Sequence, residues 1–450
     1  MSSAGWRRVR DADPARQASA ASAGHDPRPF GRDRRPLSAA PSPPEPLARR
    51  RELALLATLA AIQFTHVVDF MIVIPLAPQL MRLWDIGPQA FGLLVSAYTF
   101  AAAVSGLVAV VVVDRHDRRR ALLALYGGFV LATALCGLAP GYGALLAARV
   151  LAGAFGGVIG AMILAIVADT VPYARRARAN ALVASAFSLS AIVGVPAGLW
   201  IATVAGWRTP FLAVAALSVA VGLVATWSIP PVAGHVAEGR TRSPLGQIRA
   251  IMGVRNHWNA FAFMLALMFA GFTVIPFVAA YAVANVGLAE AELPAMYAVG
   301  GVATLVTAQV IGRLADRHGK KRVYAVVAFA SIVPILALTH MPRSTLGWFL
   351  PVSTLFFILV PGRFGPAMAL ISGSAEPRLR GSFMSFNAAV QQFGAGVSAL
   401  VAGVVVGRLA DGSLSGYGWV GWLAVAFTLA FRIRVVDARA GRDAAIPPRA

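Results

Sequence analysis

Charge is scarce in this 450-residue sequence, and negative charge is scarcer still. Only 13% of the residues are charged, and 19 Asp and Glu stand against 40 Lys and Arg, which leaves a formal net charge of +21. Hydrophobic residues make up 58% of the chain. A soluble domain cannot bury that much apolar side chain, so the composition predicts an all-α integral membrane protein that crosses the bilayer many times.

Other features are missing as well. The single cysteine, Cys136, lies inside an apolar run, so no disulfide framework is expected and its predicted role is packing. The sequence has no Walker-type phosphate loop and no cluster of metal ligands, so we expect no cofactor and no metal. It has no Ser/His/Asp or paired-carboxylate constellation, so an enzyme is not expected. The first 50 residues contain no apolar core, and a cleavable signal peptide is not predicted.

The excess of basic residues does not point to nucleic acid, because nearly all of them lie in the two tails and in short connections. Residues 1–50 are rich in Arg, Pro, Ala, Ser and Gly and cannot bury a core, so they are predicted to form a disordered tail. Contact of this tail with anionic lipid, or a gene model that begins too early, are alternatives that the sequence leaves open.

Long apolar runs fill the rest of the chain. About 20 apolar residues span the hydrocarbon core of a bilayer, and twelve runs of this kind follow one another. They cover residues 53–80, 89–113, 121–139, 142–168, 179–204, 209–229, 257–285, 293–314, 323–340, 345–373, 381–407 and 417–431. We expect an N-terminal six-helix bundle over 51–229, a polar linker over 230–256, a C-terminal six-helix bundle over 257–435 and a tail over 436–450. The twelfth run is short.

The placement of Lys and Arg predicts the orientation in the membrane. The even-numbered connections hold clusters such as Arg118–Arg120, Arg175–Arg178 and Lys320–Arg322, whereas the odd-numbered ones hold isolated residues such as Arg82 and Arg208. Positive charge favours the cytoplasmic side, so both tails and the even connections are predicted to be cytoplasmic, in a multi-pass protein of the inner membrane.

An internal repeat supports two halves. The tripeptide Val73-Ile74-Pro75 recurs as Val274-Ile275-Pro276, 201 residues later, and Asp114-Arg115-His116 recurs as Asp316-Arg317-His318, 202 residues later. Each match alone is weak. The nearly constant offset indicates two related halves of six helices.

Between the eighth and ninth runs, Gly312 is followed by Asp316, Arg317, Gly319 and three basic residues, Lys320 to Arg322. This stretch, with twelve spans arranged as six plus six, resembles the major facilitator superfamily over roughly residues 50 to 435. The resemblance implies the fold of that family and a loop that switches the two halves between conformations. The first-half copy departs from the pattern but keeps Asp114, Arg115 and Arg118.

Two further signatures are similar to those of the same family. Arg149 is followed by Gly153, Gly156 and Gly157, as in the family pattern for which a role in proton coupling is proposed. Snorkelling of Arg149 to the outer interface stays an alternative. The stretch of Gly194, Pro196 and Gly198 resembles the antiporter signature of the drug-efflux branches but lacks its adjacent Gly-Pro and closing Gly-Gly. More narrowly, the chain resembles drug/proton antiporters of the arabinose-efflux-permease-like branch.

Asp69 is the most unusual residue of the first run, because a charge in mid-membrane costs roughly 3 kcal/mol on insertion scales. On a helix, Gln63, Thr65, His66 and Asp69 fall within an arc of about 160°. A carboxylic acid in a water-poor cavity holds its proton more readily than one in water, which suits a proton carrier. A structural ion pair for Asp69 and a packed neutral ring for His66 are the alternatives.

The repeat places the titratable groups mainly in the first half, because Asp69 corresponds to Ala270 and Arg149 corresponds to the neighbourhood of Pro351. Proton coupling is therefore assigned to Asp69, His66 and Arg149. The predicted substrate contacts are Gln63, Tyr98, Arg363, Asn387 and Gln391. For Arg363, an anionic group of the substrate and an unidentified partner in the protein are equally open.

These observations favour a secondary transporter that exports a small organic solute in exchange for protons. The expected partners are that solute, the proton and the lipid bilayer, and the protein is expected to be a monomer. Uptake of a nutrient and a receptor or scaffold without transport activity are the alternative functions.

Overall fold

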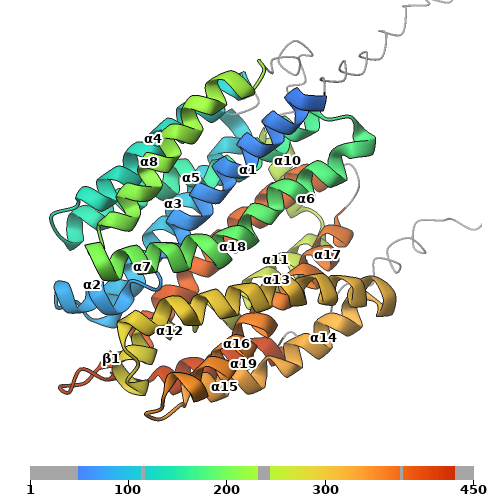
Figure 1. Ribbon diagram of the computed structural model, residues 1–450. Coiled ribbons are helices and arrows are strands. Elements are labelled where there is room, and N and C mark those ends of the chain that lie inside the picture. Colours follow the sequence, from blue (N-terminus) through green and yellow to red (C-terminus); the bar gives the residue numbers. More distant parts are fainter. Residues whose placement is uncertain (1–48, 113–116, 232–243, 376–378, 431–450) are drawn as a thin grey trace, which may run out of the picture. The chain divides into compact units, whose positions relative to one another are not determined.

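The computed structural model describes residues 49–112, 117–231, 244–375 and 379–430, which all belong to one compact unit. The long helices run roughly side by side (Figure 1). Those of the first half are α1 (Arg49–Ile72), α2 (Ala77–Leu83), α3 (Pro88–Val112), α4 (Arg118–Leu138), α5 (Tyr142–Thr170), α6 (Tyr173–Leu189), the π-helical turn η2 (Ser190–Gly194), α7 (Val195–Ala205) and α8 (Thr209–Ser228).

The second half begins with the short helix α10 (Pro244–Met252) and contains the two described strands, which pair antiparallel. Its elements are α11 (Arg255–Phe272), η3 (Ile275–Phe277), α12 (Val278–Tyr281), η4 (Ala282–Val286), η5 (Glu290–Glu292), α13 (Leu293–His318), α14 (Lys320–Ala330), α15 (Ile332–Thr339), α16 (Leu346–Gly362), α17 (Phe364–Ser374), α18 (Arg380–Val405), β1 (Gly407–Arg408), β2 (Leu414–Ser415) and α19 (Tyr417–Ala430).

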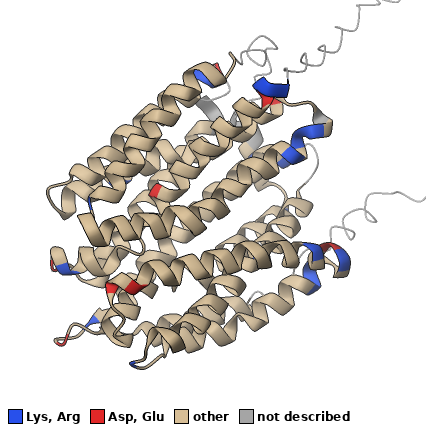
Figure 2. Ribbon diagram, in the orientation of Figure 1, with Lys and Arg blue, Asp and Glu red and all other residues tan. Residues whose placement is uncertain are grey.

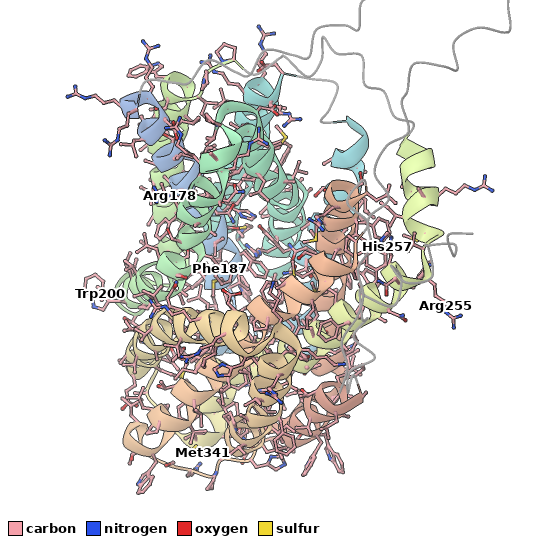
Figure 3. The ribbon with its side chains drawn as sticks, turned by 90° about the vertical axis from the view of Figure 1, so that its right-hand side faces the viewer. Arg178, Phe187, Trp200, Arg255, His257 and Met341 are labelled. Carbon is pink, nitrogen blue, oxygen red and sulfur yellow. The ribbon has the colours of Figure 1, made fainter. Side chains whose placement is uncertain are left out.

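Eleven helical segments of the described residues are long and apolar enough to cross a membrane. The twelfth apolar helix, α19, has 14 residues, as the short last run suggests. Large apolar side chains cover the outside of the bundle; Trp200, for example, is 62% exposed and projects away from the helices (Figure 3). An apolar outer surface is what a bilayer solvates, so the all-α membrane fold predicted from composition is confirmed. The boundaries of the linker and the tails remain predictions.

The Val-Ile-Pro repeat marks the same interruption in both halves. Helix α1 ends at Ile72, and a turn that contains Pro75 separates it from α2. In the second half α11 ends at Phe272, and Pro276 lies in the 3₁₀ turn η3. Proline has no N–H to donate and its ring crowds the preceding turn, so a helix breaks at or before it. The repeated tripeptide therefore corresponds to a repeated feature of the fold.

Pro196 lies at the start of α7, directly after the π-helical turn η2. Gly194 at the end of η2 and Gly198 in α7 let this segment pack against α1. A Cβ atom on Gly198 would lie 2.5 Å from Cδ1 of Ile72, and one on Gly194 would collide with Val68. The function of this segment as an antiporter signature remains a prediction.

The two halves pack directly against each other through α3 and α18. A Cβ atom on Gly92 would lie 2.8 Å from the carbonyl oxygen of Ala399, so only glycine permits this approach. Nearby, the hydroxyl of Ser96 donates to the carbonyl oxygen of Gly396 over 2.8 Å. Backbone contact this close between residues 300 apart makes α3 and α18 a central seam of the fold.

Two ion pairs cross between the halves near the connection from α2 to α3. Arg82 pairs with Glu290, and Arg408 pairs with Asp85 over 2.7 Å. Asp85 has a φ of +47°, a left-handed conformation that no other described non-glycine residue adopts. Figure 2 shows the Lys and Arg clusters of α1, α6, α13 and α14 gathered at one end of the helices.

Candidate functional site

Asp69 lies in the interior of α1 with no exposed surface, and its partner is Arg149 of α5, which is 1% exposed. Arg149 Nη1 lies 3.0 Å from Oδ2 of Asp69 and also donates to the backbone carbonyl oxygen of Asp69 over 3.2 Å. Burying a charge is costly unless an opposite charge accompanies it. Arg149 therefore points into the protein toward Asp69 and does not snorkel to the membrane interface.

Small residues of α5 explain why Arg149 stays inside. A Cβ atom on Gly153 would collide with the backbone of Tyr98, and one on Gly157 would lie 2.5 Å from Cα of Ala102. The glycine pattern that follows Arg149 therefore lets α5 approach α3 closely. This close approach leaves the guanidinium within reach of α1 and of the Tyr98 ring.

Tyr98 and His66 complete the surroundings of the ion pair. The Arg149 guanidinium carbon lies 4.3 Å from the centroid of the Tyr98 ring, and the Tyr98 hydroxyl lies 3.0 Å from Nε2 of His66. His66 is half-buried, whereas Tyr98 is 1% exposed. His66 and Asp69 share one face of α1, but no hydrogen bond joins them among the described residues; the imidazole bonds the Tyr98 hydroxyl instead.

Several polar atoms here have no hydrogen-bond partner in the protein among the described residues. They are Oδ1 of Asp69, Nε of Arg149, Nδ1 of His66 and Oγ1 of Thr133. The Thr133 hydroxyl lies beside the Asp69 carboxyl, but its geometry does not meet that of a normal hydrogen bond. Polar groups thus gather around the ion pair in the interior of otherwise apolar helices.

Two residues of α4 were not recognised from the sequence. Thr133 lies beside Asp69, and the thiol of Cys136 lies close to Arg149. Both are fully buried. Threonine and cysteine are ordinary residues in apolar helices, and only their spacing of three, which places them on one helix face, links them in the sequence.

An aromatic contact beside Asp69 joins the two halves. Phe70 of α1 and Phe272 of α11 have ring centroids 6.4 Å apart, and Phe70 also contacts Tyr98 at 5.2 Å. Both phenylalanines are only partly buried. They are the aromatic side chains that lie between the halves next to the ion pair.

Arg363 is 1% exposed and donates only to neutral oxygens among the described residues. Its partners are the backbone carbonyls of Val360 and Ala270 and the hydroxyls of Ser331 and Thr428, the last over 3.1 Å. It stands where the tenth span is interrupted, between α16 and α17 after Pro361 and Gly362. No carboxylate of the described residues forms an ion pair with Arg363. Its charge is stabilised only by neutral carbonyl and hydroxyl groups, which come from several helices.

The other predicted substrate contacts differ in accessibility. Asn387 has no exposed surface, and neither atom of its amide has a partner among the described residues. Gln63 and Gln391 are half-buried. Gln63 lies on α1 opposite α5, where a Cβ atom on Gly160 would lie 3.9 Å from its Oε1.

The predicted switch loops are described only in part. Asp114 and Arg115 lie outside the described residues, whereas Arg118 begins α4 and pairs with Asp169 over 2.9 Å. In the second half, Gly312, Asp316 and Arg317 are exposed on α13.

Gly319 separates α13 from α14 with a φ of +90°. A side chain would strain this conformation, which accounts for a glycine at this position of the motif.

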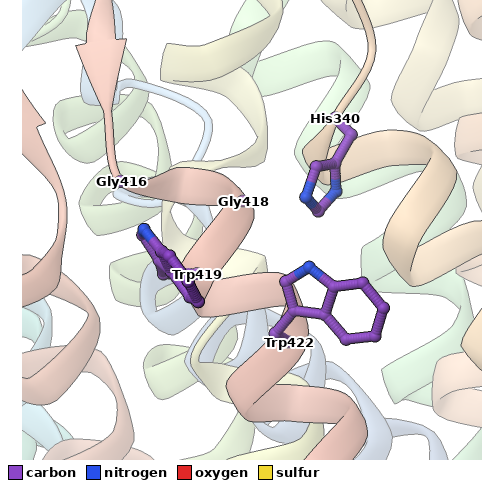
Figure 4. Close-up of a pocket in the computed structure, with 5 residues that line it drawn as sticks. All are labelled: His340, Gly416, Gly418, Trp419 and Trp422. Atoms are coloured by element: carbon purple, nitrogen blue, oxygen red, sulfur yellow. The ribbon is translucent and has the colours of Figure 1, made fainter.

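A separate pocket of about 290 Å³ lies far from Asp69 in the sequence, beside the start of α19 (Figure 4). His340, Gly416, Gly418, Trp419 and Trp422 line it. Trp419 is 73% exposed and Trp422 is 51% exposed. Tryptophan gathers where helices leave the hydrocarbon region, so these side chains are explained by the membrane interface.

Comparison with known families agrees with this architecture. The family model described as Major Facilitator Superfamily matches residues 59–399, with a second match over 260–443. The chain belongs to the major facilitator superfamily. It is therefore a multi-pass membrane transporter and not an enzyme. Transporters of this superfamily carry small molecules across the membrane.

Among related proteins, the uncharacterized MFS-type transporter YbcL of Bacillus subtilis is 27% identical over 371 residues, 82% of this chain and 92% of that protein. The chloramphenicol resistance protein of Streptomyces lividans is 28% identical over 359 residues, 77% and 87% of the two chains. Among solved structures, the D-xylose–proton symporter has a TM-score of 0.70 at 14% identity and covers 88% of this chain and 99% of its own. This last likeness concerns the fold alone.

Proposed function

We propose that this transporter exports a small organic solute from the cytoplasm in exchange for protons, with Asp69 as the proton carrier. The observation that carries the proposal is the ion pair of Asp69 with Arg149, which is buried in mid-helix and has no second charged partner among the described residues. Protonation of Asp69 neutralises the carboxylate and weakens its hold on Arg149. A change of charge at this point is a physical means to bias the packing of α1 against α5.

Two features support export rather than uptake. The kinked segment around Gly194, Pro196 and Gly198 resembles the antiporter signature, and one relative is named a chloramphenicol resistance protein. The clustering of Arg and Lys at one end of the helices supports cytoplasmic termini. Uptake coupled to protons remains the alternative that the experiment below distinguishes.

The surroundings of Asp69 suggest a largely apolar substrate with a few polar groups. Phe70 and Phe272 supply aromatic surface beside the ion pair, and the half-buried Gln63 and Gln391 are the hydrogen-bonding contacts that we infer from the sequence. Asn387, with its unpartnered amide, is a further candidate contact. Arg363 is already surrounded by acceptors, and we infer that it supports the second half rather than touching the substrate.

The proposal is tested in two steps. A pump-deficient bacterial host that expresses the chain is screened for raised resistance to a panel of compounds that includes chloramphenicol. Everted membrane vesicles with an acidic lumen are then given each compound that scores, while a pH-sensitive dye follows the lumen. An exporter that exchanges solute for protons should alkalinise the lumen and accumulate the compound.

Variants connect the result to Asp69. Asp69→Asn should abolish the proton movement, whereas Asp411→Asn, the same chemical change in an exposed turn outside the spans, should leave it intact. If Asp69→Asn exchanges protons as well as the unmodified protein does, the carrier assignment is wrong. Acidification of the lumen on adding solute would instead indicate cotransport in one direction.

A further inference from the structure

Tyr98 contacts two side chains in the neighbourhood of the buried carboxylate, Arg149 and His66. Its ring faces the guanidinium of Arg149 at 4.3 Å, and its hydroxyl bonds Nε2 of His66 at 3.0 Å. His66 stands one helical turn before Asp69 on α1. Tyr98 thus connects α3, α1 and α5 around the ion pair, and with 1% exposure it has little surface for a substrate.

The two contacts of Tyr98, with Arg149 and with His66, both help to fix the position of the Arg149 guanidinium. A desolvated guanidinium gains substantial attraction from the face of an aromatic ring, and the ring itself is fixed because its hydroxyl is bound to His66. Arg149 is therefore held in the orientation in which Nη1 reaches Oδ2 of Asp69. A looser guanidinium would stabilise the carboxylate less.

Gly156 of α5 provides the space for the hydroxyl–imidazole bond. A Cβ atom there would lie 2.5 Å from the Tyr98 hydroxyl and 3.0 Å from the His66 ring. One turn further on, a Cβ atom on Gly160 would meet only Oε1 of Gln63, at an ordinary 3.9 Å. Gly156 therefore lies beside the Tyr98–His66 bond, whereas Gly160 of the same helix does not.

The other groups that face Asp69 are few. Helix α5 contributes Arg149, α3 contributes Tyr98, and α4 contributes Thr133 and the thiol of Cys136 next to Arg149. On α1 itself His66 is the nearest titratable side chain. The elements packed on the other side of α1, which are α6, η2, α7 and α8, bring no charged side chain to Asp69 among the described residues.

We propose that Tyr98, held by His66 in the space left by Gly156, is a positioning residue that keeps Arg149 against Asp69 and thereby sets the pH at which this carboxylate takes up a proton from water. The proposal rests on the proposed function, because it assumes that Asp69 binds the transported proton. It assigns to Tyr98 a role in proton affinity rather than in substrate contact.

The test is an infrared titration of the purified full-length protein, which needs no substrate. The carboxylic acid C=O band that Asp69→Asn removes reports protonation of Asp69. In Tyr98→Leu, which removes ring and hydroxyl, the midpoint of this band should move to higher pH by about one unit. Tyr98→Phe and Gly156→Ala, which disturb only the hydroxyl–imidazole bond, should move it in the same direction by roughly half a unit.

Two matched controls separate positioning from general damage. Tyr126→Phe removes a hydroxyl that bonds Thr65 of α1 over 2.8 Å but does not contact Arg149, and Gly160→Ala adds a methyl group where there is room. Both should leave the midpoint in place. If Tyr98→Phe, Tyr98→Leu and Gly156→Ala titrate like these controls while Asp69→Asn still removes the band, the positioning role is overturned and the proton carrier stands. If Asp69→Asn removes no band, the proposed function itself fails.

Discussion

Each half of the molecule buries one arginine in its interior, and the two arginines are neutralised in opposite ways. Arg149 lies against a carboxylate, and Arg363 lies against carbonyl and hydroxyl oxygens only, among the described residues. Both donate to the backbone carbonyl of the same repeat position, which is Asp69 in the first half and Ala270 in the second. The arginine–carbonyl contact is common to both halves and belongs to the fold, whereas the carboxylate of Asp69 belongs to the proposed proton coupling.

The shared part is a guanidinium bound to the backbone just before the Val-Ile-Pro interruption. The interruption frees carbonyl groups from their helical partners, and a guanidinium with five donors satisfies them. The arginines do not come from equivalent places, because Arg363 corresponds in the repeat to Ala161 and not to Arg149. Among the described residues, only the first half places a carboxylate beside its buried arginine, so the acid is an addition to a structural feature that both halves share.

The largest effect should come from removing the partner of the buried acid. Arg149→Met leaves Asp69 buried without a counter-charge, and we expect it to lower the free energy of unfolding by about 3–5 kcal/mol. Asp69→Asn in the same chain should recover much of the loss, because it removes the unpaired charge. Unfolding of the single and double variants in mixed detergent micelles measures this, and additive losses would contradict the pairing.

Arg363→Met should cost less, about 2–3 kcal/mol, because it strands neutral acceptors and not a charge. Transport by this variant should keep its dependence on pH, although its rate falls. A pH–activity profile in everted vesicles compares it with Arg149→Met, which should lose the dependence. A flat profile for Arg363→Met would show that the second half also takes part in proton coupling.

A substitution can give the second half the acid that it lacks. Ala270→Asp places a carboxyl at the position that matches Asp69, next to the guanidinium of Arg363. We expect Arg363→Met to cost about 3 kcal/mol more in the Ala270→Asp chain than in the natural chain, since there it leaves a buried carboxylate unpaired. The infrared spectrum should show a second titrating carboxyl band. Ala270→Asn is the matched uncharged control. If Arg363→Met costs the same in the Ala270→Asp chain as in the natural chain, the side chain at position 270 does not face Arg363.

The smallest effects should arise where the halves meet at the exposed end. The hydrogen bond from Arg82 to Glu290 raises the pKa of the guanidinium, so this side of the pair stays charged throughout the physiological range. Because the Arg82 side chain is 67% exposed, Arg82→Gln should change stability by only about 0.5 kcal/mol. The difference should shrink further in high salt, as measured in the same micelle assay. A larger loss that persists in salt would indicate a contact beyond the ion pair.

The sequence predicted most of the fold because membrane helices follow from length and hydropathy. The apolar runs coincide with the helices to within a few residues, and Pro75 and Pro276 mark the interruptions. It also singled out Asp69 and Arg149, because a charge inside an apolar run is conspicuous. The partners of these side chains could not be predicted from the sequence. The offset of the repeat matches Arg363 with Ala161 and not with Arg149, yet Arg363 donates to the carbonyl of Ala270 because of how the helices pack.

The surroundings of uncharged polar residues are harder to predict from the sequence, for a related reason. Tyrosine is common in apolar helices. Nothing in the sequence indicates that the ring of Tyr98 faces Arg149 while its hydroxyl faces His66. Thr133 and Cys136 carry no signal of their own. Their neighbourhood depends on how closely α3, α4 and α5 approach one another, which the glycines of α5 permit but do not specify.

Burial of the one cysteine has a practical consequence for labelling. Cys136 has no exposed surface and lies behind Arg149, so maleimide and other thiol reagents in water should not reach it in the folded protein. Single cysteines can therefore be introduced and labelled without first removing Cys136. Spin labels or fluorophores can be attached to new cysteines on α3 and α18, and the movement of one half against the other can be followed without altering a residue beside the ion pair.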